Sequence, residues 1–145
     1  MSSFYVIDYC KKYTFDDLNG LHFNKENTFV SFKDERGNKY KIELYPDFIT
    51  DGGSVPKIFQ GIIPAWSKSN ILLNLAYCAH DFCYGSECMA RSLADDLLRS
   101  LLRDAGFSRF KAGIVCTAVN AFACCHYGRK YDDFNCAAHG KLSVI

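Results

Sequence analysis

Hydrophobic residues change their spacing near residue 69, and this change constrains the fold more than any other feature of the sequence. Before it, FYVIDY (4–9), NTFVSFKD (27–34) and KYKIELY (39–45) alternate apolar and polar residues with the period of two that is typical of strands. ERGN, a hairpin turn signal, lies between the last two segments. After residue 69, apolar residues recur at helical spacing. The sequence therefore predicts an α+β fold, with an N-terminal antiparallel sheet of hairpins followed by three C-terminal helices.

The three predicted helices cover about 70–84, 89–104 and 108–127. In the second, leucines recur at three- and four-residue spacing, and the third contains an alanine- and cysteine-rich run. Their expected start and stop signals are Ser69 or Asn70, Ser108, Gly85, Gly106 and Gly128.

A loop rich in glycine and proline, PDFITDGGSVPKIFQGIIPAW, connects the two halves. We expect it to be ordered, because its apolar residues can pack onto the fold. These residues are Phe48, Val55, Ile58 and Trp66. The sequence shows no repeat and no linker, so a single domain over 1–145 is predicted: a β-rich part with the loop (1–66), a helical part (67–128) and an irregular tail (129–145).

Composition excludes several classes of function. The net charge of +1 gives no electrostatic reason to bind nucleic acid. The longest apolar run, AGIVCTAVNAFACC (112–125), is too short to cross a bilayer, so no transmembrane segment is predicted. MSSFYVIDYC lacks the pattern of a signal peptide, so secretion by that route is not expected. Most of the eight cysteines should accordingly be free, reduced thiols.

The segment AYCAHDFCYG (76–85) places chemically active side chains in an apolar stretch. On a helix, Tyr77, His80 and Tyr84 share one face, and Asp81 points about 100° away from His80. An imidazole flanked by a carboxylate suits a general base and also a ligand for a hard cation such as calcium.

Two further carboxylates complete this candidate site. Asp95 lies fifteen residues after His80, which is far enough for a tight turn to bring a second helix back antiparallel to the first. A carboxylate opposite His80 would fix its tautomer and stabilise its protonated form. Asp51 stands among glycines whose backbone carbonyl oxygens can curl toward a cation. If the predicted helical phase is wrong by one residue, Asp96 would take the place of Asp95.

Three motifs, in this order, resemble an uncharacterised family common in tailed phages and prophages. They are T-D-G-x-S-x-P (50–56), H-D-x-x-Y (80–84) and R-x-x-A-D (91–95), and the resemblance covers roughly residues 39–125. It implies a place in the virion or in the host cytoplasm. The partners it implies are other phage structural proteins or further copies of the chain.

A weaker resemblance, to prokaryotic-type calcium-dependent phospholipase A2, implies a reaction and an antiparallel helix pair. It rests on the order of an Asp-Gly loop, H-D-x-C-Y and a later aspartate. It implies that His80 activates water, that Asp95 holds His80, and that Tyr84 is hydrogen-bonded to Asp95. Asp81 and Asp51, with loop carbonyls, would hold calcium, and a lipid ester would be the substrate. The disulfides that brace the secreted enzymes have no obvious counterpart here.

Other interpretations of the same residues remain open. We expect His80, Asp81, Tyr84 and Asp95 to form one polar cluster, here called the His80 cluster. It would also serve as a buried hydrogen-bonded network in a non-catalytic virion component of the neck, tail or baseplate. Asp51 could simply stabilise a turn, and Arg91 would more often be a solvated surface residue. A metal-dependent phosphohydrolase needs further histidines on neighbouring helices, which His22 and His126 do not supply. A zinc site would draw on Cys78, Cys83, Cys88, Cys124, Cys125, His126, Cys136 and His139.

Overall fold

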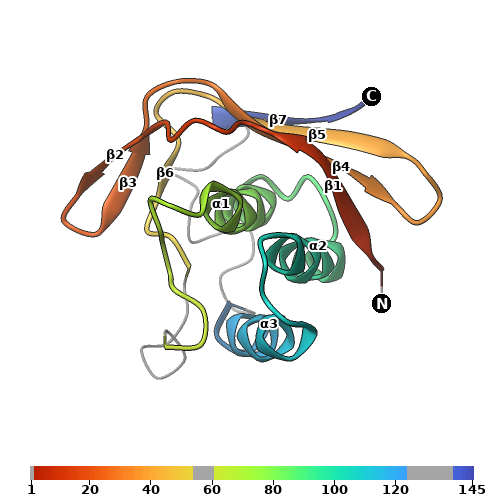
Figure 1. The fold of residues 1–145 in the computed structure, drawn as a ribbon. Coiled ribbons are helices and arrows are strands. Elements are labelled where there is room, and N and C mark those ends of the chain that lie inside the picture. The colour runs from red at the N-terminus through yellow and green to blue at the C-terminus, as the bar shows by residue number, and fades with distance from the viewer. Residues whose placement is uncertain (1, 54–60, 124–138) are drawn as a thin grey trace.

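Strands precede helices along the chain, so the predicted α+β class is confirmed (Figure 1). The computed structural model describes residues 2–53, 61–123 and 139–145. The elements within them are β1 (Phe4–Tyr9), β2 (Phe15–Leu18), β3 (Leu21–Asn24), β4 (Thr28–Asp34), β5 (Lys39–Leu44), β6 (Ile49–Thr50), α1 (Ile71–Ser86), α2 (Arg91–Asp104), α3 (Arg109–Ala123) and β7 (Gly140–Val144).

The larger sheet is antiparallel and has the strand order β1-β4-β5-β7. Its central hairpin, β4–β5, turns at Gly37, whose φ of 85° is open to glycine without strain. The period of two places one set of side chains on the inner face, and these are 2% exposed or less: Val30, Phe32, Ile42 and Leu44. The hairpin predicted around ERGN is therefore confirmed.

A second sheet has the order β2-β3-β6. Its strands β2 and β3 have no counterpart among the predicted elements, and β6 lies in the segment predicted as a loop. β2 and β3 form a hairpin beside the main layer (Figure 1). β6 is only two residues long and lies inside the Gly/Pro-rich segment, which explains why no alternation identified it. Phe48 and Trp66 of that segment pack against the core as expected, whereas Val55 and Ile58 lie outside the described residues.

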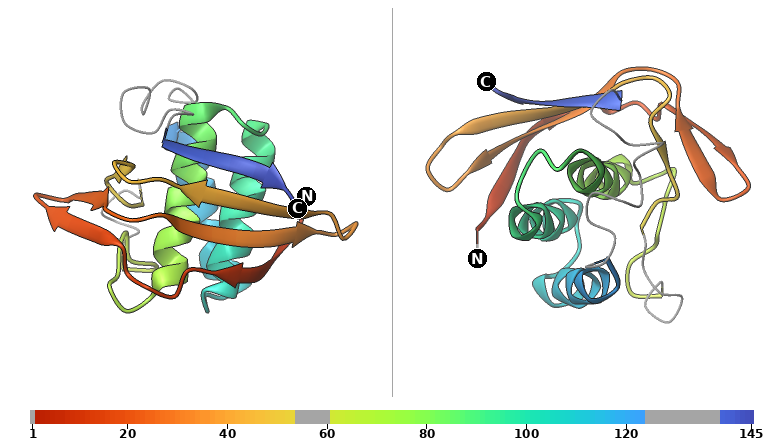
Figure 2. Two further views of the ribbon diagram at one scale, coloured as in Figure 1. Left: turned by 90° about the horizontal axis from the view of Figure 1, so that it is seen from above. Right: turned by 180° about the vertical axis from the view of Figure 1, so that it is seen from behind.

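The three helices lie on one side of the larger sheet. α1 packs against β4, α2 lies beside α1 and contacts β1, and α3 packs on α2 (Figure 1). The strands run across the helix axes (Figure 2). Every residue of α1 from Leu72 to Tyr84 is buried, as expected for a helix that is apolar on most of its circumference. Its polar residues are therefore held in the core.

The helix ends differ in part from the predicted ones. Asn70 caps α1 by accepting a hydrogen bond from the backbone N–H of Leu73, as expected. The predicted stop at Gly85 is wrong, because α1 continues to Ser86, whose hydroxyl donates to the carbonyl of Phe82. Glu87 then leaves the helix in the left-handed conformation. The second predicted helix begins two residues late, at Arg91.

The remaining helix signals are largely confirmed. Gly106 follows α2 with a φ of 108°, and the Ser108 hydroxyl accepts from the N–H of Lys111 at the start of α3. The predicted end of the third helix near Tyr127 and Gly128 lies outside the described residues. No helix in 2–53, 61–123 or 139–145 is long and apolar enough to cross a membrane.

The irregular tail predicted for 129–145 is wrong over its last residues. β7 pairs antiparallel with β5, so that Ile42 faces Leu142. The strand is five residues long and its partner lies about a hundred positions earlier, so no local pattern revealed the pairing. Gly140 fits because a Cβ there would lie 2.7 Å from the Glu43 carbonyl oxygen and 2.8 Å from the Phe82 ring.

Candidate functional site

His80 of α1 and Asp95 of α2 meet between the two helices. Nε2 of His80 lies 2.9 Å from Oδ1 of Asp95, so the predicted hydrogen-bond contact is confirmed. Tyr84, one turn after His80 on α1, contacts Arg91, which lies one turn before Asp95 on α2. Later residues of α1 thus contact earlier residues of α2, so the two helices are antiparallel as predicted. The His80 side chain is 6% exposed and that of Asp95 is 16% exposed.

Tyr84 is the second donor to the same carboxylate oxygen. Its hydroxyl donates to Oδ1 of Asp95 at 2.6 Å, and its ring lies 4.2 Å from the His80 ring between centroids. Burial and the neighbouring Asp95 raise the pKa of Tyr84, which keeps the hydroxyl protonated and able to donate. Arg91 donates from Nε to the Tyr84 hydroxyl at 3.3 Å, so it is part of this cluster and not a purely solvated residue.

The contacts of Asp96 exclude it as the partner of His80. Oδ2 of Asp96 accepts from the backbone N–H of Ser2 at 3.0 Å, and Oδ1 accepts from Arg99 at 3.1 Å. Asp96 therefore anchors the start of the chain to α2, and the alternative in which it replaces Asp95 is wrong.

The second ring nitrogen of His80, Nδ1, is the one that could accept a proton. Because Nε2 faces a carboxylate, we assign the ring proton to Nε2, which leaves the lone pair on Nδ1. Within 2–53, 61–123 and 139–145, no polar group forms a hydrogen bond with Nδ1. A neutral imidazole held in this tautomer by a carboxylate has the arrangement of a general base.

Asp81 turns away from His80, toward the loop that precedes the helices, as predicted. Its Oδ2 accepts a 2.6 Å hydrogen bond from the Thr50 hydroxyl, whose oxygen accepts in turn from the N–H of Gly52. Asp81 is 5% exposed, whereas Asp51 lies at the surface. The structure therefore joins Asp81 to the loop through Thr50, the residue before Asp51.

Two glycines let this loop approach α1 closely. A Cβ at Gly53 would lie 2.6 Å from the ring of Tyr77, and one at Gly52 would lie 2.6 Å from the carbonyl oxygen of Ala65. The N–H of Gly53 donates to that same carbonyl at 2.8 Å. The loop therefore packs directly on the ring of Tyr77 at Gly53. Ser54, Val55 and Pro56 of the first motif lie outside the described residues.

The donor set fits calcium only if backbone oxygens or water contribute. In the part of the chain that the structure describes, no three His, Cys, Asp or Glu side chains form a group that could hold a metal ion. Calcium takes six to eight oxygen ligands and accepts carbonyls and water beside carboxylates. Asp81 and Asp51 carry oxygen donors of this kind. Of the zinc candidates, Cys124, Cys125, His126 and Cys136 lie outside the described residues.

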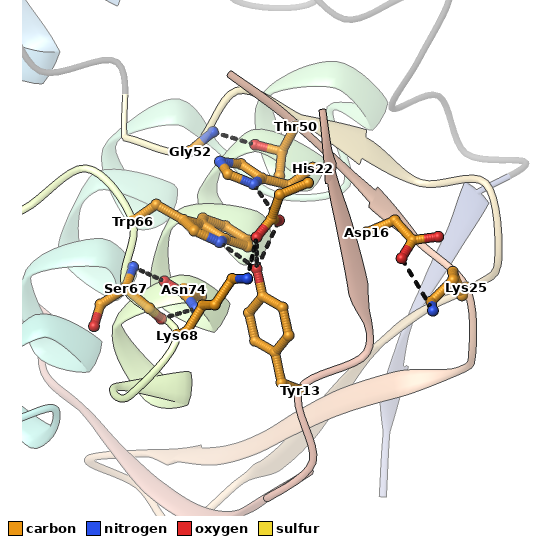
Figure 3. Close-up of polar contacts among 11 residues, drawn as sticks. Tyr13, Asp16, His22, Lys25, Thr50, Gly52, Trp66, Ser67, Lys68 and Asn74 are labelled. Carbon is orange, nitrogen blue, oxygen red and sulfur yellow. Dashed lines mark hydrogen bonds and ion pairs between the residues drawn. The ribbon is translucent and has the colours of Figure 1, made fainter. Parts of the chain in front are cut away.

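A second histidine–carboxylate pair lies in the small sheet (Figure 3). Nδ1 of His22 lies 2.7 Å from Oδ1 of Asp17, and the Tyr13 hydroxyl donates to both oxygens of that carboxylate. Trp66 stacks on the His22 ring at 3.9 Å and donates from its indole N–H to the Tyr13 oxygen. Lys68 lies 3.6 Å from the same carboxylate. Burial raises the pKa of Asp17, but the hydrogen bonds from His22 and Tyr13 outweigh it and hold that pKa below its ordinary value.

This pair is not among the predicted site residues, although the sequence contains a signal for it. Asn19 and Gly20, both with positive φ, form a two-residue hairpin turn, which places Asp17 directly opposite His22. His22 also faces Thr50 across β3 and β6. The pair therefore lies next to the loop whose Thr50 contacts Asp81.

One family comparison gives a match. A family profile described as "Protein of unknown function (DUF1353)" matches residues 28–119, which is more than half of the 145 residues. The matched segment contains His80, Asp81, Tyr84 and Asp95. No curated protein and no solved structure matches the chain. The chain therefore belongs to the family of proteins of unknown function described as DUF1353.

Proposed function

We propose that this chain is a phage- or prophage-encoded ester hydrolase with a phospholipase A2-like site, in which His80 is the general base. The observation that carries the proposal is the 2.9 Å contact between Nε2 of His80 and Asp95, together with an Nδ1 that has no hydrogen-bond partner among the described residues. A buried acceptor such as Nδ1 that receives no hydrogen bond lowers the stability of the fold by about 1–3 kcal/mol. A purely structural role for His80 does not explain this cost, whereas a general base needs the lone pair of Nδ1 to be available.

The reaction follows from this tautomer. Nδ1 of His80 takes a proton from water as the water oxygen attacks the ester carbonyl carbon. Asp95 stabilises the imidazolium that forms, and Tyr84 holds the Asp95 oxygen in place from the other side. The tetrahedral intermediate collapses when the carbon–oxygen bond to the alcohol breaks, and the imidazolium returns its proton to that leaving oxygen.

Asp81, Asp51 and carbonyl oxygens of the loop are the proposed calcium ligands. When bound, calcium would polarise the ester carbonyl and stabilise the negative charge on its oxygen. The burial of Asp81 and its orientation toward Thr50 support this assignment. Asp81→Asn is expected to weaken calcium binding, because it removes a ligand charge and preserves shape. Calorimetric titration with calcium measures the difference.

The test is hydrolysis of a short-chain chromogenic ester and of phosphatidylcholine vesicles, in calcium and in a chelator. His80→Ala should lower the rate by about 10²–10⁴-fold, the usual contribution of a general base. His22→Gln is the matched control, because it alters the second histidine–aspartate pair, which contributes no contact to His80, and it should leave the rate unchanged. If the native protein hydrolyses neither substrate faster than His80→Ala, while circular dichroism shows both folded, the proposal is refuted.

The second candidate is a non-catalytic virion component that retains the fold. The burial of the cluster favours it, because His80 is 5% exposed and Tyr84 is 2% exposed. Here the hydrogen-bonded network would specify the pairing of α1 with α2. Many copies in purified virions, without ester cleavage, would support this role, and Asp95→Leu would then lower the free energy of unfolding by a few kcal/mol.

A further inference from the structure

Two thiols are in contact at the connection between α1 and α2. Cys83 lies in the last turns of α1 and is fully buried, and Cys88 lies in the connection and is half-buried. Glu87, with a φ of 54°, turns the chain back so that the two sulfur atoms lie 3.5 Å apart. Both are free thiols in the structure. A disulfide bond is about 2.05 Å long, so a sulfur movement of about 1.5 Å would join them.

Cys88 also lines a pocket, which gives one of the two thiols access to small molecules. The pocket has a volume of about 710 Å³, within the usual range for small-molecule sites. Its apolar wall includes Phe4 and Phe32, and its charged residues are Asp34, Glu35 and Arg36. None of the residues of the His80 cluster lines it. A ligand there would reach Cys88 and not His80.

The surroundings of Cys88 favour its thiolate. A hydrogen bond with Cys83 lowers the pKa of Cys88 to about 7, with help from Ser86 and against the opposing effect of burial. The same hydrogen bond and burial raise the pKa of Cys83, so Cys88 is the thiol of the pair that ionises more readily, and the thiolate is the form that attacks disulfides.

We propose that Cys88 and Cys83 form a reactive dithiol site for small disulfides that enter this pocket, with Cys88 as the attacking thiol and Cys83 as the resolving thiol. The Cys88 thiolate attacks one sulfur of the small disulfide, which forms a mixed disulfide and releases one small thiol. Cys83 then attacks the Cys88 sulfur, which releases the second small thiol and leaves a Cys83–Cys88 disulfide. The small disulfide takes up two electrons and the two thiol protons, and the two cysteines are oxidised.

The Cys83–Cys88 disulfide would also affect the site around His80, because the two cysteines are close in sequence to residues of that site. Cys83 directly precedes Tyr84, which donates to Asp95, and Cys88 lies three residues before Arg91, which donates to Tyr84. The new bond would therefore restrain the segment between Tyr84 and Arg91. The dithiol chemistry itself does not depend on the proposed ester hydrolysis.

The test uses the reduced full-length chain with oxidised glutathione at neutral pH, followed by mass spectrometry of the intact protein and of its peptides. The native protein should form a Cys83–Cys88 disulfide. Cys83→Ser should accumulate one glutathione on Cys88, because the resolving thiol is missing. Cys88→Ser should form neither product at Cys83. Cys10→Ser is the matched control, and should still form the Cys83–Cys88 bond.

Each outcome decides one part of the proposal. A Cys83→Ser protein that stays unmodified at Cys88, while Cys10 in the same sample reacts, refutes Cys88 as the attacking thiol. A native protein that keeps glutathione on Cys88 without forming the internal bond refutes Cys83 as the resolving thiol. Circular dichroism of the serine variants verifies that each is folded, and peptide mapping separates these sites from the other cysteines.

Discussion

Tyr84→Phe isolates the contribution of a single hydroxyl to the His80–Asp95 cluster. The substitution keeps the buried ring and removes the 2.6 Å hydrogen bond to Oδ1 of Asp95, together with the longer 3.3 Å hydrogen bond from Nε of Arg91. Hydrogen bonds to charged groups contribute about 1.5–3 kcal/mol, so we expect the free energy of unfolding to fall by about 2 kcal/mol. For a chain of this length, that corresponds to a decrease in Tm of about 4–8 °C.

The assay is urea unfolding of Tyr84→Phe, Asp95→Asn and the double variant. In the Asp95→Asn background the acceptor is neutral, so the same change should cost about half as much. Tyr40→Phe is the matched control, because the Tyr40 hydroxyl donates to Asp34 over a longer distance, 3.2 Å, and both residues are only half-buried, so its loss should have a much smaller effect. Equal effects at Tyr84 and Tyr40, or equal costs with and without Asp95, would refute the argument.

Three further predictions concern other parts of the molecule. Gly53→Ala should lower the free energy of unfolding by about 1–3 kcal/mol, because the new Cβ would clash with the Tyr77 ring, whereas Gly61→Ala meets open space; thermal unfolding compares them. The lowered pKa of Asp17 stabilises the fold above the ordinary value of 3.8, and this contribution is lost as pH falls through the lowered pKa; Asp17→Asn should therefore flatten the acid limb of a stability–pH profile. Iodoacetamide should alkylate Cys88 at pH 7 about threefold faster in the native protein than in urea. The lowered pKa increases the thiolate fraction of Cys88 in the native protein, and this increase outweighs the lower nucleophilicity of that thiolate. The alkylation rate of the native protein should rise as pH passes through 7.

The His80 cluster could be predicted from sequence because it depends on helical geometry alone. A spacing of four places His80 and Tyr84 on one face, and a short connection brings Asp95 opposite them. The direction of Asp81 followed from the same helical phase. Local rules sufficed for the contacts among His80, Tyr84 and Asp95, since each joins residues on one helix or on two helices with a short connection.

The features that were missed depend on pairing between distant or very short segments. β6 has two residues and β7 has five, so neither is long enough for an alternating pattern to stand out. Gly85 was expected to stop α1, but the helix continues through it to Ser86, and the residue that leaves the helix in the left-handed conformation is Glu87. Only the pair of Asp17 and His22 had a usable local signal, in the turn at Asn19 and Gly20.

The pairing of β7 with β5 has a consequence for the order in which the chain folds. Ile42 meets Leu142 one hundred positions later, and closing such a loop in an unfolded chain costs about 2 kcal/mol more than closing one of about ten residues. Docking of the helices would bring the two ends of this loop closer together before the strand pairs. Gly140 can pack against Phe82 only once α1 has docked on the sheet. We therefore expect β7 to join the sheet in the last step of folding, so that amide exchange in this strand reports whether the helices behind the sheet have assembled.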